Sequence, residues 1–355
     1  MLYEISEKVI RLESKGKKII KFNVGDPDQF TSDEIIEESL KAMKKGKTKY
    51  SSASGEKEIK EKLSAIYKTD AERITITPGS KWAIYSIMHL MLKNGGNVVI
   101  PSPHWTAYEL IAKELGAETR ILKTEFRNDW KIDLEKLENL VDSKTKLIIL
   151  NNPNNPTSKV IDNRTLEKIV EIADSKNVTI LSDECYSDIS FVKMKSILDF
   201  GPNHILVNSF SKTFAMTGWR LGFAVTSKEL AEKITKLNQI TITNVPAFIQ
   251  HAAIKALEIK ERISKEIREI YKKRADLACE ILSKNKIKFS KPDAPFYIFP
   301  YCAQDSEKLA LDMIDRGVAI APGTAFGDYR EFFRISLTLP NNEIREGLEK
   351  IAEVL

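Results

Sequence analysis

The chain has 355 residues, of which 42% are hydrophobic, and its 55 Lys and Arg against 50 Asp and Glu give a formal net charge of +5. This composition excludes a disordered or collagen-like chain, and the nearly balanced charge argues against nucleic-acid binding. No apolar run approaches the ~20 residues that a membrane-spanning helix needs. The N-terminus also lacks the apolar segment of a signal peptide. We therefore expect a cytoplasmic protein with no nucleic-acid or membrane partner.

Cysteine usage gives no framework for cross-links or metals. The three cysteines are Cys185, Cys279 and Cys302, widely spaced and odd in number, which argues against a disulfide framework. With only four His in addition, a structural zinc site is improbable. We expect no metal.

The first helix signal lies near residue 31. Thr31 and Glu34 have the spacing of a capping box, and apolar residues recur at helical spacing from Ile35 to Met43. Gly46 is expected to end this helix.

The middle of the chain alternates short β-branched runs with helical patterns, which is typical of a parallel sheet covered on both faces. The expected strands are 74–77, 97–100, 146–150, 178–182, 204–208 and 222–226. Helices such as 81–92 and 166–176 lie between them.

After about Thr243 the pattern changes to α+β. The expected helices are 246–257, 263–284, 306–316 and 342–354, with short strands at 297–300 and 333–337. The sequence therefore predicts an α/β protein with a large domain over 32–250. A smaller domain would combine 1–31 with 251–355.

Ligands of open α/β sheets bind beyond the carboxyl ends of the strands, so the residues that follow each strand are the candidates for chemistry. Gly79 and Ser80 follow the strand at 74–77 and open a helix, where free N–H groups and the helix dipole suit a phosphate. The alternative is a turn that only caps the helix. After 146–150 comes NNPNNPTS, which is either a rigid turn or a set of amide donors for a ligand.

Two further strand ends carry charged residues. Asp183 follows an apolar strand, and a carboxylate there is costly unless it pairs with a cation or a protonated ring nitrogen; the alternative is a helix N-cap. Lys212 lies among hydroxyls and aromatics and could act as a Schiff-base nucleophile, whereas a lone lysine is more simply a surface residue. Arg220 offers a fork of donors to a phosphate. Together these groups are what pyridoxal 5′-phosphate (PLP) requires.

The stretch SFSKTFAMTGWRLGF, with NNPNNPTS, SDECY and FFRISL in the same order, resembles the class I/II aminotransferases of PLP fold type I, the aspartate aminotransferase superfamily. The resemblance runs from about Asn23 to Ser336. It implies a large domain with a mostly parallel seven-stranded sheet covered by helices on both faces, a smaller α+β domain, PLP as the cofactor and a homodimer.

Roles follow from the resemblance residue by residue. Lys212 would form the Schiff base and move the substrate's α-proton. Asp183 would pair with the ring nitrogen, and Asn155 and Tyr186 would bond the phenolic oxygen of the ring. The residues that match the phosphate site are Gly79, Ser80, Ser209, Ser211 and Arg220, with Lys81 beside them.

The remaining matched residues concern the substrate and the dimer. Arg334 would clamp the substrate α-carboxylate, helped by Asn155 and the backbone of Gly25. Trp105 would stack on the cofactor ring, although core packing is the plainer reading of an isolated Trp. Tyr50 would reach the phosphate in the neighbouring subunit.

The expected reaction is a ping-pong transfer of an amino group from an L-amino acid to a 2-oxo acid, 2-oxoglutarate being the expected acceptor. Lys81 favours aspartate by resemblance, because some prokaryotic-type aspartate aminotransferases that are similar to this chain place a lysine there, toward the distal carboxylate. A solvent-facing lysine is the alternative. A PLP-dependent C–S β-lyase stays open, as does specificity for aromatic amino acids, kynurenine or alanine. Ser158 departs from the family, which usually has Gly there, so the turn could have a different backbone conformation.

Overall fold

Seven strands form the central sheet of the computed structural model, which describes residues 2–355, in the order β2-β8-β7-β6-β5-β3-β4. They are β2 (Ile74–Thr77), β3 (Asn97–Ser102), β4 (Glu118–Lys123), β5 (Thr145–Asn151), β6 (Thr179–Asp183), β7 (Ile205–Ser209) and β8 (Gly222–Val225). Strand β8 runs in the direction opposite to the other six strands of this sheet. The predicted fold class is confirmed, and β4 is a strand that the sequence patterns miss.

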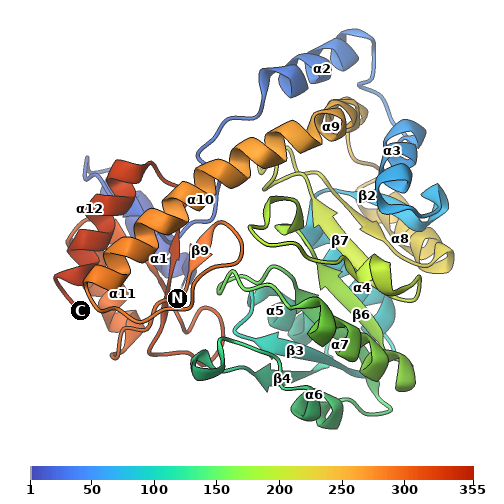
Figure 1. The fold of residues 1–355 in the computed structure, drawn as a ribbon. Helices are drawn as coiled ribbons and strands as arrows, with labels where there is room; N and C mark the ends of the chain where they lie inside the picture. The colour runs from blue at the N-terminus through green and yellow to red at the C-terminus, as the bar shows by residue number, and fades with distance from the viewer. Residues whose placement is uncertain (1) are drawn as a thin grey trace.

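Both faces of the sheet are covered by helices (Figure 1). They include α4 (Ser80–Leu92), α5 (Ala107–Glu114), α6 (Leu134–Leu140), α7 (Asn163–Ser175) and α8 (Lys228–Thr241). Along β5, Leu147 and Ile149 pack into the core beneath α4, α5 and α8, and Ile148 and Leu150 pack into the core beneath α6 and α7. A strand buried on both faces reads as a continuous apolar run, which is why the sequence predicts it well.

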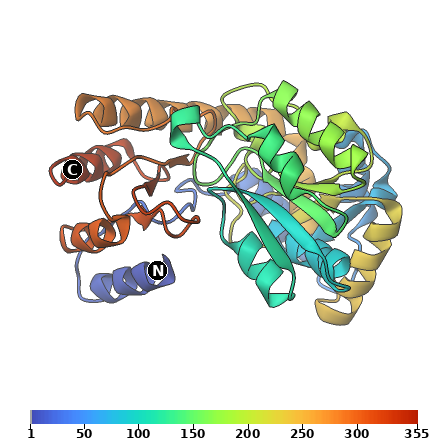
Figure 2. The same cartoon turned by 90° about the horizontal axis from the view of Figure 1, so that it is seen from below.

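A second lobe lies at the far end of the long helix α10 (Lys260–Lys284), as Figures 1 and 2 show. Its other helices are α1 (Leu2–Glu13), α11 (Ser306–Asp315) and α12 (Asn341–Ala352). Its strands are β1 (Ile20–Lys21), β9 (Tyr297–Ile298), β10 (Val318–Ala319), β11 (Ala321–Pro322) and β12 (Phe333–Ser336). Strands β11, β12 and β9 form an antiparallel sheet, while β1 pairs with β10 in parallel.

Helix α10 joins the two lobes without a break. Near its start Ile263 packs against the large core, and from Ile267 onward the helix packs into the core of the second lobe. The preceding helix α9 (Ala247–Glu258) lies against α2 (Asp33–Lys44) and α3 (Lys57–Tyr67). The division at about residue 250 stays a prediction.

Short 3₁₀ turns complete the chain: η1 (Ala71–Arg73), η2 (Phe126–Asn128), η3 (Ser187–Ile189) and η4 (Ile197–Phe200).

The predicted capping box of α2 is wrong. Ser32 occupies the N-cap, and no side chain among the described residues caps this helix. The Thr31 hydroxyl instead donates to Ala215 O at 2.8 Å and accepts from Trp219 Nε1 at 3.1 Å, while Glu34 pairs with basic side chains of α9 and α10. Long-range contacts with the loop that carries Lys212 therefore replace the local cap.

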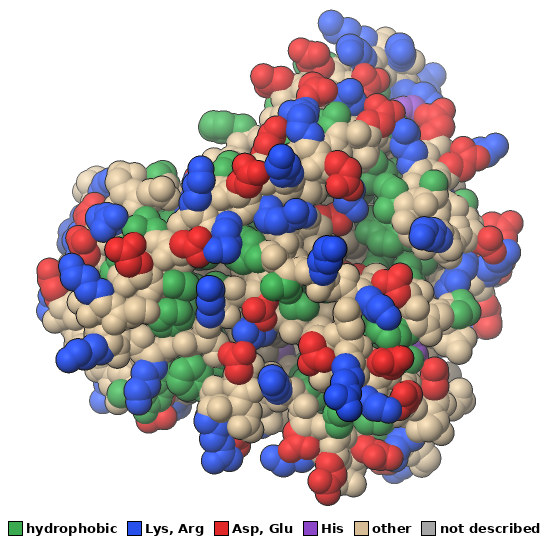
Figure 3. Space-filling view, viewed as in Figure 1, with side chains coloured by type: hydrophobic (Ala, Val, Ile, Leu, Met, Phe, Trp, Pro, Cys, Tyr) green, Lys and Arg blue, Asp and Glu red, His purple; other side chains and the backbone are tan. Residues whose placement is uncertain are grey.

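Positive and negative side chains are interspersed on the face seen in Figure 3, in agreement with the balanced composition. None of the helices in residues 2–355 is long and apolar enough to cross a membrane.

Glu184, directly after β6, is a buried carboxyl group that makes the stability pH-dependent. Its Oε1 accepts from Ser182 Oγ at 3.0 Å and from Ile197 N at 2.8 Å, and burial raises its pKa from 4.5 to about 7. The folded state therefore holds more protons than the unfolded state between these values, so this group costs stability progressively as the pH rises through that window.

We predict that Glu184→Gln, which keeps an acceptor oxygen but has no charge, raises the free energy of unfolding by about 2–3 kcal/mol at pH 8 and by less than about 1 kcal/mol at pH 5. Urea unfolding at both pH values measures this difference. The control is Glu232→Gln on the exposed face of α8. An equal gain at both pH values would contradict the assignment of the charge to Glu184.

Candidate active site

The predicted catalytic and substrate residues meet where the carboxyl edge of the sheet faces the second lobe. Lys212, which follows β7, donates from Nζ to Gly25 O at 2.5 Å. Arg334, on β12, donates to Asn155 Oδ1 at 3.0 Å. Residues far apart in sequence thus form one polar cluster, as the order of strand ends predicts.

Asp183 ends β6 with 5% of its surface exposed. Its Oδ2 accepts from Tyr108 OH at 2.7 Å and its Oδ1 from Cys185 N at 3.3 Å. Burial raises the pKa of this carboxyl, while its hydrogen bonds and the charge of Lys212 oppose the rise. No ion pair within residues 2–355 balances it, so the site suits a protonated ring nitrogen.

Tyr108 is a functional candidate that the sequence analysis misses. It lies on α5, is 1% exposed, and its ring packs edge-on against Trp105 with centroids 5.4 Å apart. Burial raises the pKa of its hydroxyl well above the ordinary value, so the group is a neutral donor to Asp183. The sequence does offer one signal for this role: Tyr108 comes three residues after Trp105, near the predicted site, and a buried tyrosine hydroxyl needs a hydrogen-bond partner.

The predicted phosphate turn has no room for a side chain at Gly79 or at Gly222. Gly79 precedes α4 with φ +82°, and a Cβ added there would lie 2.6 Å from Arg220 Nη2. A Cβ on Gly222 would lie 2.6 Å from Ser80 N. The N–H groups at the start of α4 and the guanidinium of Arg220 therefore border the same space, which suits a phosphate dianion.

Two predicted serines lie next to this turn. Ser209 ends β7, and its Oγ accepts from Ser211 N at 3.3 Å. Cys185 lies beside them: burial and the Asp183 carboxylate raise its thiol pKa well above the ordinary value, and hydrogen bonds with Ser80 and Ser209 partly oppose this. The thiol thus connects Asp183 to the phosphate turn. The sequence patterns give Cys185 no such role.

Arg334 is 5% exposed and held on three sides. Besides its bond to Asn155, it donates from Nη2 to Asn23 O at 2.7 Å, and its guanidinium lies between the rings of Tyr297 at 4.3 Å and Phe326 at 4.8 Å. Its Nε is buried without a hydrogen-bond partner among the residues that the structure describes. Burial lowers the pKa of this group, and a carboxylate ligand would satisfy the free donor.

Asn155 and Tyr186 lie close to Arg334. The backbone N of Asn155 donates to Asn151 Oδ1 at 2.7 Å, and Asn151 Nδ2 donates to Asp183 O at 3.1 Å. The hydroxyl of Tyr186 is 3.2 Å from that of Tyr297. Asn151 and Tyr297 are therefore further members of the site, and the sequence gives no role to Tyr297.

Lys81 and Trp105 contact each other, whereas Tyr50 stands apart. Lys81 Nζ lies 4.9 Å from the centre of the half-buried Trp105 ring. Tyr50, between α2 and α3, is 89% exposed. Its predicted place in a neighbouring subunit stays a prediction.

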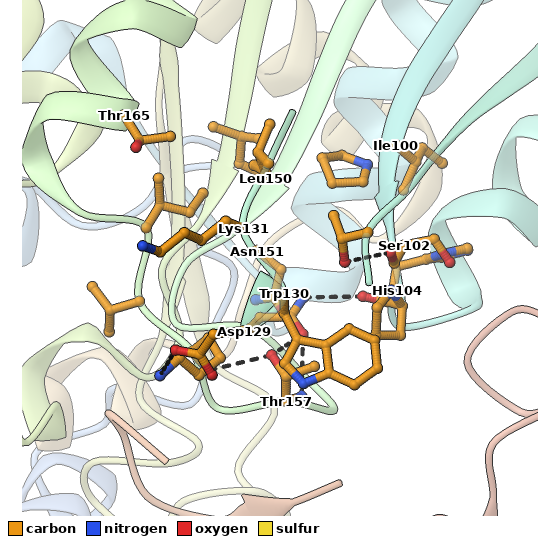
Figure 4. A pocket seen from close by; sticks show the side chains of 18 of the residues that line it. Ile100, Ser102, His104, Asp129, Trp130, Lys131, Leu150, Asn151, Thr157 and Thr165 are labelled. Atoms are coloured by element: carbon orange, nitrogen blue, oxygen red, sulfur yellow. Dashed lines mark hydrogen bonds and ion pairs between the residues drawn. The ribbon is translucent and has the colours of Figure 1, made fainter. Parts of the chain in front are cut away.

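A separate cavity of about 370 Å³ flanks the loop that carries Asn155 (Figure 4). Asn151 and Thr157 of this loop line it, together with His104 and Trp130. None of the site residues predicted from the sequence lines it, but Tyr108 and Asn151, which both bond Asp183, do. Two contacts between residues that line this cavity hold the loop here: Asn154 Nδ2 donates to Pro103 O at 3.3 Å, and Lys159 Nζ pairs with Asp129 at 2.8 Å.

We predict that Tyr108→Phe lowers the free energy of unfolding of the cofactor-free protein by about 1.5–3 kcal/mol at pH 8, because a buried carboxylate loses its donor. Urea unfolding gives the value. In the control Tyr85→Phe, on a half-buried ring stacked between Trp82 and His89, we expect a change within about 0.5 kcal/mol. Equal losses in the two variants would refute a special role for the Tyr108–Asp183 bond.

Comparison with known proteins agrees with this arrangement. The family "Aminotransferase class I and II" matches residues 17–351. The aspartate aminotransferase of Thermococcus kodakarensis is 34% identical over 100% of this chain and 92% of its own length. The (5-formylfuran-3-yl)methyl phosphate transaminase of Methanocaldococcus jannaschii is 34% identical over 97% of this chain and 94% of its own length.

Among solved structures, the aspartate aminotransferase of Thermus thermophilus with maleate superposes with a TM-score of 0.96 at 28% identity, covering 100% of this chain and 96% of the other. The family match over nearly the whole chain, together with the clustered lysine, aspartate and arginine, leads to one conclusion: the protein belongs to the class I and II aminotransferases.

Proposed function

We propose that this aminotransferase uses PLP to transfer the amino group of L-aspartate to 2-oxoglutarate by a ping-pong mechanism. The observation that carries the proposal is the juxtaposition of an amine and a carboxylate clamp. Lys212 bonds the carbonyl of Gly25, and Arg334 bonds the carbonyl of Asn23, two residues earlier in the same segment. A substrate held by its α-carboxylate at Arg334 would therefore present its α-carbon to Lys212.

The residues present fit PLP in both charge and space. The cradle at Gly79 and Arg220 would hold the phosphate with Ser80, and Ser209 and Ser211 would complete its hydrogen bonds. The remaining groups would hold the ring: Asp183 at its nitrogen, Asn155 and Tyr186 at its phenolic oxygen, and Trp105 by stacking. When bound, PLP supplies an electron sink for the substrate's α-carbon.

Lys212 would act as both amine partner of the cofactor and proton carrier. An amine at this place can take the proton from the substrate's α-carbon and return it one step later, as general acid–base catalysis requires. Asn155 and Arg334 would orient the substrate meanwhile. The second half-reaction, with the 2-oxo acid, would use the same groups in the reverse order.

The choice of aspartate is supported by Lys81 and by the relatives. Lys81 provides a positive charge against the Trp105 ring, next to the site, where a distal carboxylate could be bound. Relatives named aspartate aminotransferase are about one-third identical over almost the entire chain. The transaminase of Methanocaldococcus jannaschii is equally similar, so its named phosphate compound belongs among the acceptors to be tested.

We also propose a homodimer, since Tyr50 projects into solvent where a second subunit would complete its surroundings. The cytoplasmic location remains a prediction.

The first test is the absorbance spectrum of the PLP-loaded protein before and after single amino acids are added without any 2-oxo acid. We expect aspartate to convert the cofactor band stoichiometrically and to release one equivalent of its 2-oxo acid. A band that persists while cystathionine yields pyruvate would identify a C–S β-lyase instead. Failure to take up PLP would contradict the proposal.

We predict that Lys212→Ala still takes up PLP but loses turnover by about 10³-fold or more, since it lacks the group that moves the proton. Steady-state rates and cofactor content measure the two effects separately. Lys228→Ala, on the exposed surface of α8, is the matched control and should keep the wild-type rate. Near-normal turnover of the Lys212 variant would overturn the assignment.

A further inference from the structure

The loop that carries Asn155 is fastened to the segment before β9. Lys159 Nζ pairs with Asp129 at 2.8 Å and with Asp293 at 3.0 Å. Asp293 N in turn donates to Ser158 O at 2.9 Å, and Asp293 Oδ2 accepts from Val160 N at 3.2 Å. Asp129, Lys159 and Asp293 all line the cavity, so these bonds fasten the loop along the wall of the cavity.

Ser158 adds a side-chain bond to this connection at a conformational cost. It is 1% exposed and has a φ of +53°, in the left-handed region that glycine adopts freely and serine does not. Its Oγ donates to Pro295 O at 3.2 Å and accepts from Tyr297 N at 3.2 Å. An unfavourable backbone conformation that is kept together with two buried side-chain bonds points to a role for the hydroxyl.

Tyr297, which Ser158 holds, contacts three of the predicted site residues. Its ring centre lies 4.3 Å from the guanidinium carbon of Arg334, and its hydroxyl lies 3.2 Å from that of Tyr186. A Cβ added to Gly25 would come within 2.0 Å of the same hydroxyl. The ring therefore forms one wall of the place where a substrate carboxylate would bind.

We propose that Ser158 and Tyr297 are positioning residues for the substrate α-carboxylate. Ser158 fixes the backbone of Tyr297, and the ring of Tyr297 holds the guanidinium plane of Arg334 against Phe326. The same short segment supplies Asn155, whose oxygen accepts from Arg334. Residues 155–158 thus orient the clamp from two directions, and a clamp oriented in advance loses less entropy when it binds.

The inference rests on the proposed function, since it takes Arg334 as the carboxylate clamp. Its test is Ser158→Gly in the PLP-loaded enzyme. Glycine suits the left-handed backbone, so the variant should fold, and it loses the small CH2OH side chain with its two hydrogen bonds. The probe is maleate, a dicarboxylate that has no amino group to transfer.

We expect the Kd for maleate to rise about five- to tenfold, the size of effect that one or two lost hydrogen bonds produce. The KM values for aspartate and 2-oxoglutarate should rise by a similar factor. Turnover at saturation should fall less than about twofold, and the cofactor spectrum should be unchanged, because this pair of residues acts on binding rather than on proton transfer.

Two further variants separate positioning from general stability. Ser190→Ala removes a buried hydroxyl that bonds the same segment, at Asp293 O, but does not touch Tyr297. It should bind maleate as the wild type does. Tyr297→Leu removes the ring, and we expect it to weaken maleate at least as much as Ser158→Gly.

The double variant decides whether Ser158 acts through Tyr297. In the Tyr297→Leu background, Ser158→Gly should have almost no further effect on the Kd for maleate. Additive effects, or an unchanged Kd in Ser158→Gly alone, would overturn the positioning role while wild-type transamination stood. A wild-type enzyme that neither transaminates aspartate nor binds maleate would instead overturn the proposed function.

Discussion

The site depends on one buried carboxylate, Asp183, which ends the apolar strand β6 without an ion pair among the described residues. A charge in such a place is unfavourable unless neighbouring groups hold it, and here Tyr108 and the backbone of Cys185 do so. Asn151 then bonds the backbone of Asp183 and that of Asn155. Through these few bonds the carboxylate is linked to the loop that orients Arg334, so the cofactor and substrate parts of the site share one framework.

Parallel strands explain why these groups meet. Strands β5, β6 and β7 lie side by side and point the same way, so Asn151, Asp183 and Ser209 all lie at one edge of the sheet. The strands are buried along almost their whole length, and each ends in a polar residue at this edge, where ligands of such sheets bind. The second lobe supplies Arg334 from a short antiparallel sheet, so neither lobe holds the whole site.

Sequence patterns predict the parts of this arrangement that depend on local periodicity. The strand at 74–77, Ile-Thr-Ile-Thr, is a β-branched run and has the predicted bounds. Strands β5 to β7 differ from prediction by one residue at either end, and β5, buried on both faces, has a nearly continuous apolar run. Strand β4 reads Glu-Thr-Arg-Ile-Leu-Lys and is largely exposed, so it lacks that signal. The predicted capping box of α2 is wrong for another reason, because the Thr31 hydroxyl bonds Ala215, which is far away in sequence. The roles of Tyr108 and Tyr297 likewise depend on residues far away in sequence.

Several residues near the site have strained backbone conformations. Ser158, Ala215, Arg220 and Phe296 all have positive φ although none is glycine. Each also makes a contact that an unstrained turn would misplace: Ala215 accepts from Thr31, Arg220 faces Gly79, and Phe296 stacks on Tyr271 with ring centres 4.5 Å apart. Such conformations persist only where the surrounding structure determines them. Here the sheet and the packed cores of the two lobes hold the ends of these loops. The strained residues therefore keep their conformations, and the groups that would bind substrate keep fixed positions.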